Sequence, residues 1–154
     1  MSATGTSPAD SAAGSGDSSR RHVEDVIGAL NAHDAAAFAS FYSEDAVVYD
    51  AGTPEPLRGR AAIQQSAERH LTWRPDFDMQ VQDILVDGSG VAFRAVIVGT
   101  HTGPLQLPAG EVPPTGRRVE TPMAVFSRLG EDGLIVEEYR YYDLVKLLQQ
   151  LGLA

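Results

Sequence analysis

The sequence predicts an α+β fold in which helices pack on one side of a curved, mostly antiparallel sheet. Two observations lead to this class. Apolar residues recur at helical spacing before residue 71 and again after Asp143, whereas most of the chain between them alternates with a period of two. Turn signals at residues 87–90 and 131–133 divide that alternating part into a meander. A curved sheet closed by helices forms a cone, and the open mouths of such cones hold ligands.

Three helices are expected in the amino-terminal half. In the first, residues 20–32, the apolar side chains that recur at helical spacing are Val23, Val26, Ile27 and Leu30. Asp34 is a good N-cap for a second, short helix. Residues 60–71 form the third helix, with Ile63 and Ala67 facing inward. Residues 1–19 have almost nothing to bury and are predicted to be a disordered tail, so residues 20–154 form a single domain.

One strand is expected between the second and third helices, and four more are expected after the third helix. A bulge is expected at residues 82–83, and residues 103–116, which contain four prolines, are expected to be a loop. Asp143 is expected to cap a short closing helix. The strands themselves are residues 46–50, 77–86, 91–101, 118–129 and 134–143.

Composition excludes several classes of function. The formal net charge is −9 and the pI about 4.7, which argues against nucleic acid or an anionic membrane as a partner. The chain has no cysteine, no apolar run of membrane-spanning length and no signal-peptide pattern, so a cytoplasmic protein is expected. The four histidines lack metal-ligand spacing and no phosphate-cradling glycine loop is present, so neither metal nor cofactor is expected.

The last strand has the most informative pattern. Alternation places Glu138, Arg140 and Tyr142 on one face, after Leu134 and Val136. The opposite face carries Ile135, Glu137, Tyr139 and Tyr141. A face that changes from apolar to ionisable is typical of a pocket floor, but also of a strand that runs out into solvent with Glu138 and Arg140 as a surface ion pair.

Two sets of segments resemble known families. The segments 29–34, 42–50 and 57–63 are similar to the amino-terminal half of Δ5-3-ketosteroid isomerases. A second set resembles the SnoaL-like polyketide cyclases: residues 99–103, 113–118, 132–138 and 147–152. Both families belong to the nuclear transport factor 2-like superfamily, and the resemblance spans about residues 20–153. It implies a cystatin-like α+β barrel, closed into a cone by three helices, and a homodimer.

The resemblance also assigns positions. Asp50 falls where the isomerases place their proton-shuttling carboxylate, whereas their oxyanion donors fall on Val26 and on Ala124 or Val125. The last-strand aspartate of the cyclases and of limonene-epoxide hydrolases falls on Arg140. The cyclases pair this aspartate with a histidine on the penultimate strand, whose position falls on Ala124 or Val125. We therefore expect a rearranged site, in which Glu138 and His101 replace this histidine–aspartate pair.

The predicted catalytic residues are Asp50, His101 and Glu138, converging on an apolar cavity of roughly 300–1,000 Å³. Burial is expected to raise the pKa of Asp50 toward neutrality. Each residue also has a structural alternative, such as a loop cap for Asp50 and a loop-carbonyl partner for His101. His22 and His33 are expected to be solvated and His70 to be structural. The substrate-binding set is Arg140 and Tyr142, which would stabilise oxyanion charge, with Tyr49, Trp73 and Phe126.

These residues predict a cofactor-free acid–base enzyme acting on an apolar small molecule. By resemblance, the reaction is cyclisation or isomerisation of a polyketide- or terpenoid-type natural product. One alternative is an epoxide-opening cyclase or epoxide hydrolase. Others are a non-catalytic binding module, or a cone filled by its own side chains whose sheet face is used for dimerisation.

Overall fold

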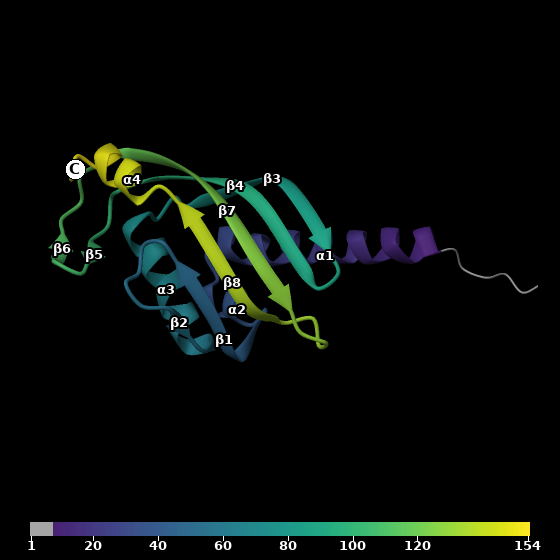
Figure 1. The fold of residues 1–154 in the computed structure, drawn as a ribbon. Helices are drawn as coiled ribbons and strands as arrows, with labels where there is room; N and C mark the ends of the chain where they lie inside the picture. The colour runs from purple at the N-terminus through teal and green to yellow at the C-terminus, as the bar shows by residue number, and fades with distance from the viewer. Residues whose placement is uncertain (1–7) are drawn as a thin grey trace, which may run out of the picture.

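The computed structural model describes residues 8–154, with side chains from residue 16 onward, and contains one curved six-stranded sheet (Figure 1). The strand order is β2-β1-β8-β7-β4-β3. Neighbouring strands are antiparallel except β1 and β8, which are parallel. The strands are β1 (Tyr42–Asp50), β2 (Leu57–Arg58), β3 (Asp78–Asp87), β4 (Gly90–Thr100), β7 (Arg118–Leu129) and β8 (Ile135–Tyr142).

The helices are α1 (Pro8–Asn31), α2 (Ala35–Ala39), α3 (Arg60–Trp73) and α4 (Leu144–Gln150). Helices α1, α2 and α3 lie on one side of the sheet (Figure 1). The predicted α+β class, the order of the helices and the curved, mostly antiparallel sheet are therefore confirmed. The sheet itself is not a closed barrel, because β2 and β3 remain as its edges and the helices complete the cone.

Helix α1 packs on the sheet through the apolar side chains predicted from its spacing. Val23, Val26, Ile27 and Leu30 are each 4–6% exposed, and burial of each is worth roughly 1.5–3 kcal/mol. At the end of the helix, the Asn31 side-chain amide donates to the carbonyl of Met79 at 2.9 Å and accepts from its N–H at 2.8 Å. These two bonds attach α1 to the edge strand β3.

The amino-terminal boundary differs from the prediction. Helix α1 begins at Pro8, inside the segment that was predicted to be a disordered tail. Proline suits the first helical position because it has no N–H to leave unpaired, and residues 9–19 contain no second proline to interrupt the helix. Residues 1–7 of the predicted tail lie outside the described residues.

The proline-containing segment 103–116 is not a simple loop. It includes a hairpin of β5 (Leu105–Leu107) and β6 (Gly110–Val112), with Leu105 paired to Val112. The prolines stand before, between and after these strands, so none removes a hydrogen-bond donor from the ladder.

Helix α4 closes one end of the sheet. The Asp143 carboxylate caps it by accepting from the Lys146 N–H at 3.0 Å, as predicted. A small second core forms here from Trp73, Val119 and Leu151. This end of the cone is therefore packed, and the main core lies between α1–α3 and the sheet.

Three irregularities set the faces of the strands. The register of β3 shifts between Val81 and Asp83, where the sequence predicted a bulge. A second shift lies in β1 between Tyr42 and Val47. A third, opposite Arg128 and Leu129, turns Ile135 inward, although plain alternation placed it on the outer face. Beyond that bulge, Glu138, Arg140 and Tyr142 share the inner face as predicted.

Candidate active site

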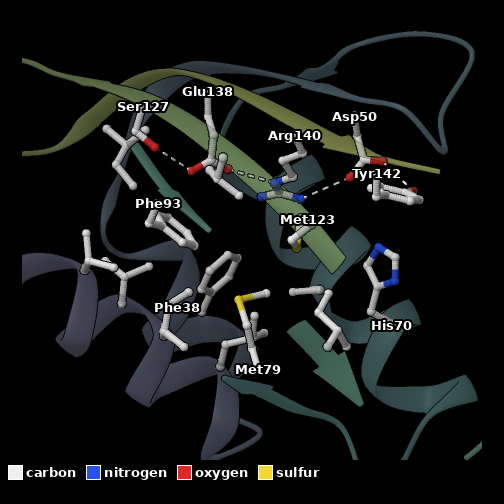
Figure 2. Close-up of a pocket in the computed structure, with 18 of the residues that line it drawn as sticks. Phe38, Asp50, His70, Met79, Phe93, Met123, Ser127, Glu138, Arg140 and Tyr142 are labelled. Carbon is white, nitrogen blue, oxygen red and sulfur yellow. Dashed lines mark hydrogen bonds and ion pairs between the residues drawn. The ribbon is translucent and has the colours of Figure 1, made fainter. Parts of the chain in front are cut away.

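A cavity lies between the helices and the concave face of the sheet. Most of its wall is apolar, with Phe38, Met79, Phe93 and Met123 projecting into it (Figure 2). These side chains reduce its volume to about 90 Å³, below the roughly 300–1,000 Å³ that is common for drug-sized ligands. The expected volume was therefore wrong, although the two flexible methionine side chains adapt to a ligand at low cost.

Arg140 joins the polar groups on the β8 side of the cavity (Figure 2). Its Nε donates to Glu138 Oε2 at 2.8 Å, and one terminal nitrogen donates to the Tyr42 hydroxyl at 3.2 Å. The other terminal nitrogen lies 3.5 Å from Asp50 Oδ2. The side chains of Arg140, Asp50 and Glu138 are only 12%, 4% and 4% exposed, so this is an internal network and not the surface ion pair considered above.

Glu138 has its acceptor capacity largely filled by the protein. Ser127, its cross-strand partner on β7, donates its hydroxyl to Oε1 at 2.9 Å. Tyr42 donates to Oε2 at 2.8 Å, beside the Arg140 bond to the same oxygen. A carboxylate with three protein donors is well suited to hold Arg140 in place and poorly placed to accept a further proton.

Asp50, at the end of β1, is held differently. Its Oδ1 accepts from the Gly52 N–H and from the Tyr142 hydroxyl, both at 2.8 Å. Its only contact at Oδ2 within the described residues is the long one to Arg140. Burial raises the pKa of Asp50, but Arg140 and these hydrogen bonds outweigh burial, and the pKa lies below its ordinary value. The expected upward shift of this pKa was wrong because the donors around the carboxylate come from segments far apart in the chain, and no local pattern indicates them.

The other groups of this network keep their protons at neutral pH. Burial and the charge of Glu138 raise the pKa of Tyr42, and burial and Asp50 raise that of Tyr142. Burial lowers the pKa of Arg140, but Glu138 and its other partners outweigh it, so the net shift is upward. The wall of the cavity therefore presents ionised Asp50 beside two phenol donors and one guanidinium.

Comparison with known proteins defines the family of this arrangement. The model of the SnoaL-like polyketide cyclase family matches residues 20–151. The chain belongs to the SnoaL-like polyketide cyclase family. This confirms the resemblance to the SnoaL-like polyketide cyclases, and it supports an enzyme with a cyclase-type function.

Solved structures agree with this assignment. IdmH from Streptomyces antibioticus, a proposed polyketide cyclase, is 32% identical, with a TM-score of 0.71 over 86% of this chain and 97% of IdmH. AclR from Streptomyces galilaeus, a proposed hydroxylase, is 25% identical, with a TM-score of 0.76 over 89% and 97% of the two chains. A protein from Catenulispora acidiphila with a ketosteroid isomerase-like fold, 21% identical, has a TM-score of 0.71 over 86% and 93%, and shows the fold alone. No curated protein matches the chain.

His101 is not part of this SnoaL-like site, which corrects its predicted role. It lies one residue beyond β4, fully buried, with its ring edge against Trp73 and its Nδ1 accepting from the Thr115 N–H at 3.2 Å. The predicted face of the strand was right, since Ile97, which alternation places on the same face as His101, lines the cavity. However, the side chain of Arg74 lies against Gly99, between Ile97 and His101 on that face.

Three predicted substrate contacts are also placed elsewhere. Tyr49 and Phe126 lie on the outer face of the sheet, 39% and 51% exposed. Tyr49 stacks there on Tyr139, with ring centroids 4.7 Å apart. Trp73 is buried in the second core. Asp50 on β1 and Ser127 on β7 face the cavity, so alternation points their neighbours Tyr49 and Phe126 to the other face of the sheet. The assignment of Tyr49 and Phe126 to the cavity was therefore inconsistent with the strand pattern.

Other cavity residues were missed. Tyr42 lines the cavity, and so does His22, which was predicted to be solvated. His70 and Arg74 on and just after α3 also line it. The sequence did indicate that His70 and Arg74 face inward, because they continue the inward stripe of Ile63 and Ala67 at helical spacing.

Their protonation follows from their contact with each other. A terminal nitrogen of Arg74 lies 3.2 Å from His70 Nδ1. Because arginine can only donate, Nδ1 is the acceptor and the ring proton of His70 is on Nε2. Burial and Arg74 lower the pKa of His70 to about 3, so at neutral pH it is an uncharged donor. Figure 2 shows its ring close to Tyr142 and Asp50.

Within residues 8–154, no group of three or more His, Asp or Glu side chains is arranged to hold a metal ion. None of the described helices is both long and apolar enough to cross a membrane.

Proposed function

We propose that this SnoaL-like protein catalyses a cofactor-free proton transfer that cyclises or isomerises an apolar polyketide- or terpenoid-type molecule. One observation carries the proposal. Asp50 is an ionised, desolvated carboxylate on the wall of an apolar cavity, with phenol and guanidinium donors beside it. A base next to hydrogen-bond donors is what abstraction of a proton next to a carbonyl requires.

Asp50 is assigned as the base because Oδ2 has spare acceptor capacity. It removes a proton from a carbon next to a carbonyl, which leaves an enolate and a neutral Asp50. In isomerisation, Asp50 returns that proton to another carbon of the same molecule. In cyclisation, the enolate carbon bonds to an electrophilic carbonyl carbon of the molecule, and the new alkoxide takes the proton.

Arg140 and Tyr142 are assigned to the developing oxyanion. Tyr142 donates to Asp50 in the free protein at 2.8 Å and would turn toward the enolate as Asp50 becomes neutral. Glu138 is a positioning residue, since it contacts Arg140 and is itself saturated by Ser127 and Tyr42. Loss of one oxyanion donor costs roughly 10²–10³ in rate, and we expect Tyr142→Phe to fall in this range.

The test uses carbon-acid exchange, which does not require the natural substrate. The protein is incubated in D₂O with 2-tetralone, and loss of the α-proton signal is followed by NMR. We expect exchange faster than in buffer, abolished by Asp50→Asn and only reduced by Glu138→Gln. Exchange that equals the buffer rate would contradict proton abstraction from carbon, and exchange that survives Asp50→Asn unchanged would show that Asp50 is not the base.

Epoxide opening is the second candidate, because Tyr142 and Asp50 form a donor–acceptor pair at 2.8 Å on one wall. In that reaction Tyr142 protonates the epoxide oxygen while Asp50 takes the proton of the attacking hydroxyl, and Asp50 then passes that proton to the Tyr142 phenolate, which restores both groups. Turnover of limonene oxide without exchange of 2-tetralone would favour this reaction. Binding of both probes with turnover of neither would favour the passive binding module.

A further inference from the structure

Arg74 is a buried cation without a carboxylate partner. The residue is 3% exposed, and no carboxylate among residues 16–154 comes within 4 Å of its side-chain nitrogens. Its Nε is buried and makes no hydrogen bond to the described residues. Burial of an arginine normally requires a paired anion or a full set of acceptors, so this arrangement requires an explanation.

The surroundings hold the guanidinium in place but do not neutralise it. It stacks over the ring of Trp73, 3.9 Å from the centroid, and lies 5.1 Å from that of Phe77. Its stem packs on Gly99, where an added Cβ would lie 3.1 Å from Arg74 Cδ. The nearby acid Asp76 is exposed and accepts from the N–H and the hydroxyl of Thr100, both at 2.7 Å. Asp50 is already bonded to Gly52, Tyr142 and Arg140.

A further donor lies on the wall of the same cavity. The Thr121 hydroxyl on β7 is buried and has no partner among the described residues. His70 also lines this wall, but its Nδ1 faces Arg74, so its Nε2–H lies on the other edge of the ring from the guanidinium. The cavity thus has donors from Arg74 and Thr121 in addition to the network around Arg140, and these two lack an acceptor among the described residues.

We propose that Arg74 and Thr121 bind a carboxylate group carried by an otherwise apolar ligand. A carboxylate supplies the charge that Arg74 lacks and lone pairs for both donors. The apolar wall around Phe93 and Met123 takes the rest of the ligand. The inference deepens the proposed function, because it takes this ligand to be the substrate and names it as an apolar acid anchored at one end.

The test compares two probes that differ in one group, cyclohexanecarboxylate and cyclohexylmethanol. Trp73 is the only tryptophan of the chain and carries the guanidinium on its ring, so its fluorescence reports on occupancy without interference from these non-aromatic probes. Affinities are then measured by calorimetry at neutral pH. A charge-assisted contact in a buried site predicts that the acid binds at least about tenfold more tightly than the alcohol. Equal affinities would overturn the proposal.

Variants assign the preference to these residues. Arg74→Met should remove the preference for the acid while leaving the affinity for the alcohol within about twofold, and Arg74→Lys should restore part of it. Arg94→Met, the same change at an exposed arginine with a surface partner, should alter neither affinity. If Arg74→Met does not fold, Thr121→Val, which keeps the side-chain shape, should weaken binding of the acid several-fold. An acid preference that survives in Arg74→Met, or an unchanged affinity for the acid in Thr121→Val where the first variant fails, contradicts the site.

Failure of this inference and failure of the proposed function give different results. Binding of the acid at Arg74 without any proton exchange would support the site and contradict the enzyme reaction. Proton exchange that depends on Asp50, with no preference for the acid, would do the reverse.

Discussion

Replacing Arg140 by methionine should destabilise the protein more than any surface change, because it leaves two buried carboxylates without their shared cation. The guanidinium contacts Glu138, Asp50 and the Tyr42 hydroxyl, and its side chain is 12% exposed. Methionine keeps much of the apolar stem, so the lost quantity is mainly electrostatic.

The magnitude follows from the burial of the pair. Removing one partner of a buried ion pair costs about 3–5 kcal/mol, from a total of roughly 5–15 kcal/mol for an ordinary domain. For a chain of 154 residues, this lowers the melting temperature by about 6–20 °C. Arg94→Met breaks the ion pair with Asp83, whose side chains are 65% and 56% exposed, and should cost less than about 1 kcal/mol.

The assay is urea denaturation of wild type, Arg140→Met and Arg94→Met at several pH values. Arg140 lowers the pKa of Asp50, so its stabilisation is present above the unfolded pKa and is lost as the pH falls through the folded value. The difference between wild type and Arg140→Met should therefore shrink below about pH 4. Adding Glu138→Gln to Arg140→Met should recover part of the loss at neutral pH. A loss no larger than that of Arg94→Met, or one that does not change with pH, would refute this reasoning.

Three further predictions concern other parts of the molecule. The pKa of His70 is lowered to about 3, so His70 binds a proton less readily in the folded than in the unfolded state. The free energy of unfolding should therefore fall as the pH drops below about 6.5, on the order of a few kcal/mol by pH 3. His70→Asn, measured by the same urea titrations, should lack this part of the loss. Gly52→Ala places a Cβ against the Tyr142 hydroxyl, and should slow 2-tetralone exchange by displacing that donor from Asp50, whereas an unchanged rate would argue against a role for Tyr142. The expected homodimer remains a prediction, and the outer aromatic face, where Tyr141 is 55% exposed, is the surface we expect it to use; light scattering should show a dimer for wild type and a monomer for Tyr141→Glu, and a wild-type monomer would contradict it.

The elements were predictable because their patterns are local. Helical spacing located α1 and α3, and alternation with turn residues located β3, β4, β7 and β8. Alternation on β8 alone also placed Glu138, Arg140 and Tyr142 on one face. The parallel pairing of β1 with β8, which sets Asp50 opposite Arg140, joins segments far apart in sequence and has no local pattern. Asp50 was assigned to the site only because of the family resemblance, and its pairing with Arg140 was not predicted.

His101 lies outside the cavity, whereas His70 and Arg74 line it. This difference from the prediction shows what the pattern of a single strand or helix does not determine. Alternation gives the face of a side chain but not how far along the strand the cavity extends, and His101 has the right face beyond the end of the cavity. That end is set by Arg74, whose stem covers Gly99. The position of Arg74 and the extent of the cavity both depend on the packing of α3 against β4 at Gly99. A larger residue at position 99 would displace the Arg74 side chain and with it the guanidinium. The same contact that removes His101 from the site thus places a second cation in it, which is why the chemistry at this end of the cavity is that of a bound anion and not of a histidine shuttle.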